Sequence, residues 1–579
     1  MSERVYANHL PYGKITDKIA DEPADGKQTN RQTESRQTVR QTTEEYALNI
    51  QESMQRPGPR KGIHMRYNNP IIPGFYPDPS ICKADGRYYM VCSSFQYFPG
   101  VPLFESRDLV NWTQIGHVLT RESQLPLKGA GSDGGIYAPT IRFHEGRFYM
   151  VTTNVSGMGN FYVWTDDIYG EWSEPVKVQQ GGIDPSLYFE DGRAYFMSNG
   201  DDDQGISGVT QCEIDIETGE KKSPSRCVWQ GTGGRYLESP HLYRINGQYY
   251  LMAAEGGTEY GHMVVYAKGP SVNGPFTSYP GNPVLTNRNL GGYVIQGCGH
   301  GDLVEDERGN FWMVHLAFRQ IHQWMTFHIT GREVCLVPVT FQENGWFTAG
   351  VGGITPTEVE TDRIPDSVVQ SRKRRDTFSD TRVGVDWVFL RRPHGEDFSF
   401  TETAYRLYPT NLALGEKQDS PAFVAIRQRQ MRGQIRCNIQ VSEGEAGISL
   451  YMDHQHHYDL AVARMAAAGG AGDVYRVMTR SVVGGVSHVV EETVVRADTE
   501  ITLRIALEPM EYSFSAVFSQ QGQETSCPLG RLQTRYLSTE VAGGFTGVMI
   551  ALYAQEESLT GKGAEPAVFT DFEAAYEEE

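Results

Sequence analysis

The sequence predicts an all-β protein with two main domains, a β-propeller followed by a β-sandwich. Three observations predict this fold class. The chain has 579 residues, enough for two or more domains, and is rich in Gly and Pro, with 62 and 29 residues. A hairpin pattern recurs five times in the first part of the chain. Shorter segments in which apolar and polar residues alternate, as in half-buried strands, continue toward the C-terminus.

Each copy of the repeat predicts a β-hairpin. An apolar strand begins at a Pro or a Gly, a polar turn with Gly follows, and the second strand is rich in Tyr, Phe, Met and Val. The copies begin at Pro79, Pro139, Pro185, Pro240 and Gly301. Their spacing is close to the length of a four-stranded propeller blade, so we expect one blade for each copy.

Acidic residues occupy one fixed point of this repeat. Asp78 and Asp184 directly precede the Pro of their copies, Glu238 stands one residue earlier in its copy, and His300 takes this position in the fifth. The innermost strands of a propeller line its axis, so we expect these side chains to meet in one pocket. Asp next to Pro also begins turns for backbone reasons alone, but three acids in register favour a shared site.

The remaining segments complete the predicted organisation. Residues 1–65 are polar and without period, so we expect a disordered N-terminal extension. The propeller is expected over 66–355 and a polar linker over 356–375, where the basic run 372–375 suits a solvated linker better than a nuclear signal. Short alternating strands over 376–579 predict the β-sandwich.

Composition and charge exclude several classes of function. The net charge of −20 argues against nucleic-acid binding. No stretch approaches the length of an apolar membrane span, so we expect no membrane insertion. The eight Cys show no metal-ligand spacing and are expected to be buried thiols. The N-terminus lacks a basic region followed by an apolar core, which favours a cytoplasmic location and leaves secretion open.

The acids suggest a chemistry. Glycoside hydrolysis needs two carboxyl groups beside the scissile bond, one to protonate the leaving oxygen and one to act as base or nucleophile. A third acid keeps the pKa of the donor high by like-charge repulsion. Aromatic rings next to the acids suit sugar binding, although core packing is the favoured explanation for each one taken singly. The candidates are Phe75, Tyr76, Phe95, Tyr97, Phe98 and Tyr137.

Several motifs, found in the right order, resemble glycoside hydrolase family 43. Residues 69–80 read NPIIPGFYPDPS, residues 93–102 read SSFQYFPGVP, and residues 106–112 read SRDLVNW. The resemblance covers about 68–579 and is strongest to the branch of β-xylosidases and α-L-arabinofuranosidases with a C-terminal β-sandwich. It implies a five-bladed propeller, in agreement with the number of repeats, and an inverting mechanism.

The resemblance also implies a role for each acid. Asp78 matches the general base that activates water, Glu238 matches the general acid, and Asp184 matches the residue that modulates the pKa of the acid and orients it. Ser239 stands where the family often has Gly, which leaves the acid in place. In an inverting enzyme the carboxyl groups of base and acid lie roughly 6.5–9.5 Å apart.

Other residues match substrate-binding positions of the family. His300 matches an axial His below the sugar, which in many members also helps to hold a central cation, often calcium; no cofactor is expected to be required. Arg332 matches an Arg that hydrogen-bonds the sugar. The remaining matches line or close the pocket: Phe95, Thr258, Tyr137 where many relatives have Trp, and Phe545 from the second domain, which favours exo-action.

The implied activity is that of an inverting glycosidase that releases xylose, arabinose or both from xylo-oligosaccharides or arabinoxylan. Exo-β-1,4-xylosidase is favoured, and α-L-arabinofuranosidase is the alternative. A fructan or sucrose hydrolase shares the architecture, but its opening motif is Asn-Asp-Pro-Asn, whereas this chain has Pro-Asp-Pro-Ser. A non-catalytic propeller that binds carbohydrate or protein also stays open, although it has no need of all three acids. Homo-oligomerisation is left open.

Overall fold

The computed structural model describes residues 65–365, 367–378, 383–401, 403–465, 473–497, 500–556 and 565–577. These residues belong to one unit of the chain, His64–Glu579. The predicted N-terminal extension lies outside the described residues, except for Met65. Strands dominate this part of the chain, and its one α-helix is α2 (Thr539–Ala542). Among the described residues, no helix is long and apolar enough to cross a membrane.

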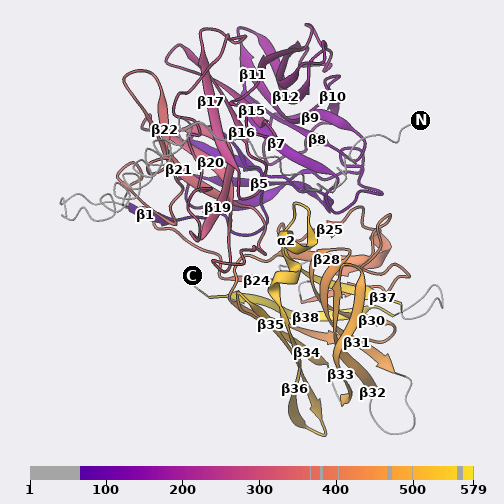
Figure 1. The fold of residues 1–579 in the computed structure, drawn as a ribbon. Coiled ribbons are helices and arrows are strands. Elements are labelled where there is room, and N and C mark those ends of the chain that lie inside the picture. The colour runs from indigo at the N-terminus through magenta and orange to yellow at the C-terminus, as the bar shows by residue number, and fades with distance from the viewer. Residues whose placement is uncertain are drawn as a thin grey trace, which may run out of the picture. The chain divides into compact units, whose positions relative to one another are not determined.

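Five four-stranded antiparallel sheets follow one another along the first part of the chain (Figure 1). The first three contain β2 (Ser80–Ala84), β3 (Arg87–Val91), β5 (Gly100–Ser106), β6 (Thr113–Leu119); β7 (Ile136–His144), β8 (Arg147–Asn154), β9 (Gly159–Thr165), β10 (Val176–Lys177); and β11 (Ile183–Glu190), β12 (Arg193–Asp201), β13 (Ser207–Ile214), β14 (Arg226–Trp229). The last two contain β15 (Glu238–Ile245), β16 (Gln248–Glu255), β17 (Met263–Gly269), β18 (Thr277–Ser278); and β19 (Ile295–Glu305), β20 (Phe311–Arg319), β21 (Glu333–Phe341), β22 (Phe347–Ala349).

The first two strands of every sheet are the hairpin that the repeat predicts. The first strands of successive sheets contact one another in the order β2, β7, β11, β15 and β19, and β19 returns to contact β2. The sheets are therefore arranged as in a β-propeller, with these five strands innermost. Apolar clusters fill the spaces between neighbouring sheets.

A strand lies inside the segment predicted as a linker. β23 (Glu358–Thr361) pairs with β1 (Met65–Asn68), in the antiparallel register that joins Met65 to Thr361. The four residues of each strand alternate between buried and exposed. Such a short alternation is a weak signal, and the two strands are far apart in sequence, so local patterns did not predict the pairing.

Two large antiparallel sheets form the C-terminal β-sandwich, as predicted. One has eight strands: β24 (Arg375–Thr377), β26 (Phe398–Phe400), β27 (Ala404–Leu407), β29 (Gly433–Gln440), β34 (Ile501–Leu507), β35 (Glu511–Gln520), β36 (Gln523–Gln533) and β38 (Ala567–Tyr576). The other has six: β28 (Ala422–Arg427), β30 (Glu445–Asp453), β31 (His456–Met465), β32 (Asp473–Val483), β33 (Val486–Ala497) and β37 (Met549–Gln555). One apolar core joins the inner faces of both sheets.

The sandwich contacts the propeller sheets near the two sequence motifs at residues 69–80 and 93–102. β25 (Phe389–Leu390) pairs with β4 (Tyr97–Phe98). An apolar cluster combines Phe75 and Phe95 with residues of the sandwich such as Phe423. The buried Arg427 donates a hydrogen bond from Nε to the carbonyl oxygen of Phe75 at 2.7 Å. These contacts support the loop on which the first acid stands.

All eight Cys are described and free. Six of them are buried, as predicted, whereas Cys227 and Cys527 are partly exposed.

Candidate active site

The five equivalent positions of the repeat share an unusual backbone conformation. Asp78, Ala138, Asp184, Ser239 and His300 have φ angles of 56°, 31°, 53°, 58° and 51°, in the left-handed region that few non-Gly residues adopt. In the last four sheets the pairing of the first two strands also shifts register here. Such bulges redirect side chains and are common beside active sites. These five residues therefore lie at the same end of the innermost strands, and at each of them the backbone departs from the regular alternation of a strand.

Asp78 is held as a carboxylate by a dense set of donors. Its Oδ1 accepts a hydrogen bond from Nη1 of Arg332 at 2.9 Å, and its Oδ2 accepts one from Oγ of Ser93 at 2.6 Å. Burial alone would raise the pKa of Asp78, but the charges of Arg332 and His300 and the bond from Ser93 together lower this pKa below its ordinary value. Asp78 is therefore ionised at neutral pH, as a base must be.

Glu238 and Asp184 are shifted in the opposite direction. Burial, together with the negative charge of Asp78, raises the pKa of Glu238 to about 7, against a smaller lowering by Arg332. Burial and the charges of Glu238 and Asp78 raise the pKa of Asp184 well above its ordinary value. The backbone N–H of Ser239 donates to Oδ2 of Asp184 at 3.2 Å. The pKa values of both carboxyl groups are raised, and the charge of Glu238 contributes to the shift of Asp184, so the two titrate as a pair that retains a proton near neutral pH.

His300 lies next to two of the three acids, Asp78 and Asp184. Its Nδ1 is 3.7 Å from Oδ1 of Asp78 and 3.9 Å from Oδ2 of Asp184. Burial lowers the pKa of His300 to about 4, although Asp78 opposes this shift. The imidazole is therefore neutral at neutral pH, and it carries a positive charge only in the acidic range in which Asp78 titrates.

Arg332 connects the two domains at the site. Besides Asp78, its Nη1 donates to Oγ1 of Thr258 at 2.8 Å, and its Nη2 donates to the carbonyl oxygen of Phe545 at 3.3 Å. The guanidinium also lies 5.7 Å from the ring centres of both Phe95 and Phe545. Arg332 thus positions the base and a loop of the sandwich with one buried side chain.

Three aromatic rings form one wall of the site. The ring centres of Phe95 and Tyr137 are 5.0 Å apart, and Phe545 lies 6.1 Å from Phe95 and 6.2 Å from Tyr137. Asp133 fixes this wall, because its carbonyl oxygen accepts from the hydroxyl of Tyr137 at 2.6 Å and its Oδ1 accepts from the N–H of Phe545 at 3.0 Å. Phe545 remains 38% exposed, so it stands at the rim.

The structure thus brings together all nine side chains that the sequence analysis places at the site. Other aromatic candidates are structural: Phe75, Tyr76 and Tyr97 are fully buried in apolar clusters, and Phe98 packs against another cluster. Core packing, which the sequence analysis favours for each ring taken singly, therefore accounts for these four candidates.

Sequence reasoning missed three residues of the site. Ser93, which bonds Asp78, lies within the SSFQ motif, and that motif is the signal that points to it. Asp133 lies in a glycine-rich loop without a distinctive pattern. His262 has Nε2 only 3.6 Å from Oε1 of Glu238, but it stands outside the repeated hairpin. The register that identified the acids therefore gives no signal for His262.

A second charged cluster lies farther along the innermost strands. The guanidinium of Arg142 binds both carboxylate oxygens of Asp302, at 2.7 and 3.0 Å. Oδ2 of Asp302 also accepts from Oγ of Ser80 at 2.6 Å, and the hydroxyl of Tyr243 donates to Oδ1. Burial would raise the pKa of Asp302, but Arg142, His241 and these bonds lower it far below its ordinary value.

This cluster bears on the central cation that the family resemblance implies. Nη2 of Arg142 donates to Nδ1 of His241 at 2.9 Å, and the rings of His241 and His300 are 6.4 Å apart. The region next to His300 therefore already contains a buried positive charge, and the carboxylate of Asp302 is fully engaged by Arg142, Ser80 and Tyr243. In the described part of the chain, no group of three His, Cys, Asp or Glu side chains is arranged to hold a metal ion.

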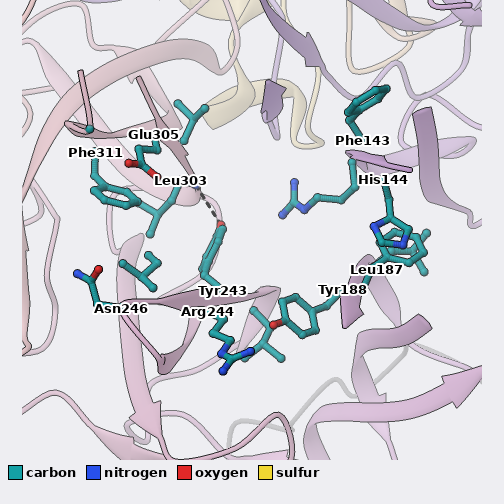
Figure 2. A pocket seen from close by; sticks show the side chains of 16 residues that line it. Phe143, His144, Leu187, Tyr188, Tyr243, Arg244, Asn246, Leu303, Glu305 and Phe311 are labelled. Carbon is teal, nitrogen blue, oxygen red and sulfur yellow. Dashed lines mark hydrogen bonds between the residues drawn. The ribbon is translucent and has the colours of Figure 1, made fainter. Parts of the chain in front are cut away.

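Arg142 also separates the acids from a cavity at the opposite ends of the same strands. This cavity has a volume of about 560 Å³. Figure 2 shows residues that line it, among them Tyr188, Tyr243 and Phe311. The hydroxyl of Tyr243 accepts a hydrogen bond from the N–H of Leu303 at 3.0 Å. The site with the three acids and this cavity are thus distinct.

The fold and the site define a class of protein: a propeller-type hydrolase with buried carboxyl groups whose pKa values are shifted in opposite directions. Residues 67–347 match the model of glycosyl hydrolases family 43, and residues 375–575 match the beta-xylosidase C-terminal concanavalin A-like domain. The chain is 38% identical over 499 residues to the non-reducing end α-L-arabinofuranosidase BoGH43B of Bacteroides ovatus, covering 84% of this chain and 91% of that protein. The chain belongs to glycoside hydrolase family 43.

Further relatives agree with this assignment. A xylosidase/arabinosidase of Butyrivibrio fibrisolvens is 35% identical over 85% of this chain and 96% of its own length. The crystal structure of a xylan β-1,4-xylosidase from Bacillus halodurans superposes with a TM-score of 0.78 at 28% identity, over 88% of this chain and 100% of that one. The similarity spans both domains.

Proposed function

We propose that this protein is an inverting exo-glycosidase that releases xylose, arabinose or both from xylo-oligosaccharides or arabinoxylan. One observation carries the proposal: two neighbouring carboxyl groups have pKa values shifted in opposite directions, Asp78 downward and Glu238 upward to about 7. A base that is ionised and an acid that is protonated at the same pH are what hydrolysis of a glycosidic bond requires.

In the proposed reaction Asp78 takes a proton from a water molecule as that water attacks the anomeric carbon. Glu238 donates its proton to the departing glycosidic oxygen in the same step, so that charge balances between base and acid. Arg332 and Ser93 keep Asp78 ionised before the step. The separation of roughly 6.5–9.5 Å between the two carboxyl groups, which leaves room for the water, stays a prediction.

Asp184 is proposed to modulate the acid. The charge of Glu238 raises the pKa of Asp184. Because the repulsion between two like charges is reciprocal, an ionised Asp184 favours the protonated form of the donor. The N–H of Ser239 fixes the orientation of the carboxyl group of Asp184, and thereby its position relative to Glu238.

The sugar is proposed to bind between His300 below and the aromatic wall at the side. Arg332 and Thr258 present polar groups to the sugar hydroxyls, while Phe95 and Tyr137 present rings. Phe545 reaches this wall from the sandwich domain and is proposed to shorten the site at one end. A site closed in this way favours removal of single sugars from chain ends.

We also propose that the five four-stranded sheets are the blades of a five-bladed propeller, over residues 66–355. The closed circuit of contacts among the innermost strands supports this count. The segment 356–375 then joins the propeller to the sandwich, which begins at about residue 376, and β23 anchors that segment to the first strand.

No cofactor is proposed for the reaction. The charge of Arg142 stands beside His241 near His300, where it supplies a fixed positive charge. We expect EDTA to leave both the initial rate and the melting temperature unchanged. A loss of either that calcium restores would contradict a metal-independent site.

The test of the proposed function is hydrolysis of 4-nitrophenyl β-D-xylopyranoside beside 4-nitrophenyl α-L-arabinofuranoside. Glu238→Ala and Asp78→Ala serve as controls. Strong preference for one substrate names the activity, and activity on both supports one small shared site. If the folded protein hydrolyses neither, a non-catalytic carbohydrate-binding propeller becomes the better interpretation.

A further inference from the structure

His262 is a fully buried residue directly behind the proposed acid. It precedes β17, and its two ring nitrogens face different groups. Nδ1 lies 3.3 Å from the carbonyl oxygen of Gly297, and Nε2 lies 3.6 Å from Oε1 of Glu238. The side chain of His262 has no exposed surface. None of the roles assigned above uses this residue.

The surroundings determine where the ring carries its proton. A carbonyl oxygen can only accept, so the contact with Gly297 requires the proton on Nδ1. Burial and the charge of Arg332 lower the pKa of His262 to about 4, so the ring is neutral at neutral pH. Nε2 is then a lone-pair acceptor, and it has no hydrogen-bond partner among the described residues.

Packing prevents the ring from turning away. A Cβ on Gly299 would lie 2.3 Å from Cε1 and Nδ1 of His262, so the imidazole packs directly on the backbone beside His300. The main chain is also fixed, since the carbonyl oxygen of His262 accepts from Oγ1 of Thr286 at 2.8 Å and its N–H donates to Glu259 at 2.9 Å. The unsatisfied acceptor is therefore aimed permanently at Glu238.

We propose that His262 is a positioning residue that accepts a hydrogen bond from the protonated carboxyl group of Glu238 in the resting enzyme. A lone pair facing a carboxyl group favours its acid form and repels its ionised form. The distance of 3.6 Å is longer than a formed bond, and such contacts tighten during catalysis. When substrate binds, the glycosidic oxygen replaces Nε2 as the acceptor of the same proton. This inference rests on the proposed role of Glu238 as the acid.

Other groups also act on Glu238. Asp78 favours its protonated form through its negative charge, and Arg332 favours the ionised form. Asp184 interacts with it as well, since the charge of Glu238 raises the pKa of Asp184. These groups are unchanged by substitution of His262. A shift in the titration of Glu238 in such a variant therefore reports the contribution of His262 itself.

Two substitutions separate the two nitrogens. His262→Asn keeps a donor near the position of Nδ1, where it can bond Gly297, and removes the acceptor that faces Glu238. His262→Gln places a carbonyl oxygen near the position of Nε2 and so restores an acceptor. We expect the basic limb of the pH profile of kcat/KM to move down by about one pH unit in His262→Asn and to stay near the wild-type position in His262→Gln.

Leaving groups provide a second readout. In His262→Asn we expect about a tenfold loss at pH 7.5 on substrates with poor leaving groups and little loss on a 2,4-dinitrophenyl glycoside, which needs no protonation. An unmoved basic limb, with equal losses on both kinds of substrate, would show a purely structural role and overturn the proposal. If the wild-type enzyme hydrolyses none of these glycosides, the proposed function fails instead.

A measurement on the unsubstituted ring covers the case in which His262→Asn does not fold. In protein labelled with ¹⁵N at histidine, we expect one ring that is neutral at pH 6 with its proton on Nδ1, and whose Nε2 signal shifts in Glu238→Gln. A spectrum in which every ring that responds to Glu238→Gln carries its proton on Nε2 would contradict the proposal.

Discussion

The two charged clusters along the innermost strands differ in how well their charges are compensated. Around Asp302, one carboxylate receives both arms of Arg142, Ser80 and Tyr243, and its pKa is lowered. At the other end, Asp78, Asp184 and Glu238 share the single guanidinium of Arg332, which among these acids donates a hydrogen bond to Asp78. The pKa values of Asp184 and Glu238 are consequently raised. Complete compensation is typical of a structural cluster, and incomplete compensation is typical of a catalytic one.

The largest effect is expected for the base. Asp78→Asn removes the group that deprotonates water, so we expect a loss of about 10⁴-fold or more in kcat on every substrate. The melting temperature should change little, because the loss of the ion pair with Arg332 is offset by relief of the repulsion between Asp78 and the other two acids. Initial rates on both nitrophenyl glycosides, with the thermal unfolding curve as control, test this. Full activity in Asp78→Asn would remove Asp78 from the mechanism.

The acid should show a smaller, substrate-dependent effect. Glu238→Gln retains the shape but not the proton, so we expect a loss of about 10²- to 10⁴-fold on xylo-oligosaccharides. The loss should be slight on a 2,4-dinitrophenyl glycoside, whose leaving group needs no proton. Comparison of kcat for Glu238→Gln on the two kinds of substrate tests the role of Glu238 as the acid. Equal losses on both would assign Glu238 to another role.

The matched substitution in the structural cluster should affect stability instead. Asp302→Asn leaves the buried guanidinium of Arg142 without its counter-charge, so we expect the free energy of unfolding to fall by about 3–5 kcal/mol. Urea unfolding of Asp302→Asn beside Asp78→Asn measures the difference. If both variants lose the same stability, the distinction between the two clusters is wrong.

The smallest effect concerns the dependence of stability on pH. The folded-state pKa of Glu238, about 7, exceeds its ordinary value of 4.5, so the folded protein binds this proton more tightly than the unfolded chain. The corresponding stability is present below about pH 4.5 and is lost as the pH rises through 7. We expect Glu238→Gln to be more stable than the wild type by about 1–3 kcal/mol at pH 8 and to lose this advantage at pH 4.5. An advantage that is independent of pH would contradict the raised pKa.

The repeat explains why the acids were predictable. Asp78, Asp184 and His300 recur at one register position, and the structure gives that position one backbone conformation, with φ between 51° and 56° for these three residues. A repeated local geometry leaves a repeated sequence signal. The C-terminal sandwich was predictable for a similar reason, because some of its strands alternate between buried and exposed residues, as in Gly433–Gln440 and Ile501–Leu507.

Features that depend on single long-range contacts left no such signal. β23 finds its partner at the other end of the propeller domain, and His262 reaches Glu238 from a loop outside the repeated hairpin. The roles of Phe75 and Tyr97 were also decided by tertiary contacts, because the sandwich covers them and turns them into core residues. The local sequence identifies these residues as aromatic, but it does not show whether their rings face a core or a binding site.

The most direct test of Glu238 as the proton donor is the pH dependence of kcat/KM on the preferred 4-nitrophenyl glycoside, measured for the wild type and for Glu238→Gln. Because the pKa of Glu238 is about 7, we expect the wild-type rate to fall above about pH 7. We expect this basic limb to be absent from the residual activity of Glu238→Gln. A basic limb that persists unchanged in Glu238→Gln would show that another group donates the proton, and would contradict the central role of the undercompensated acids.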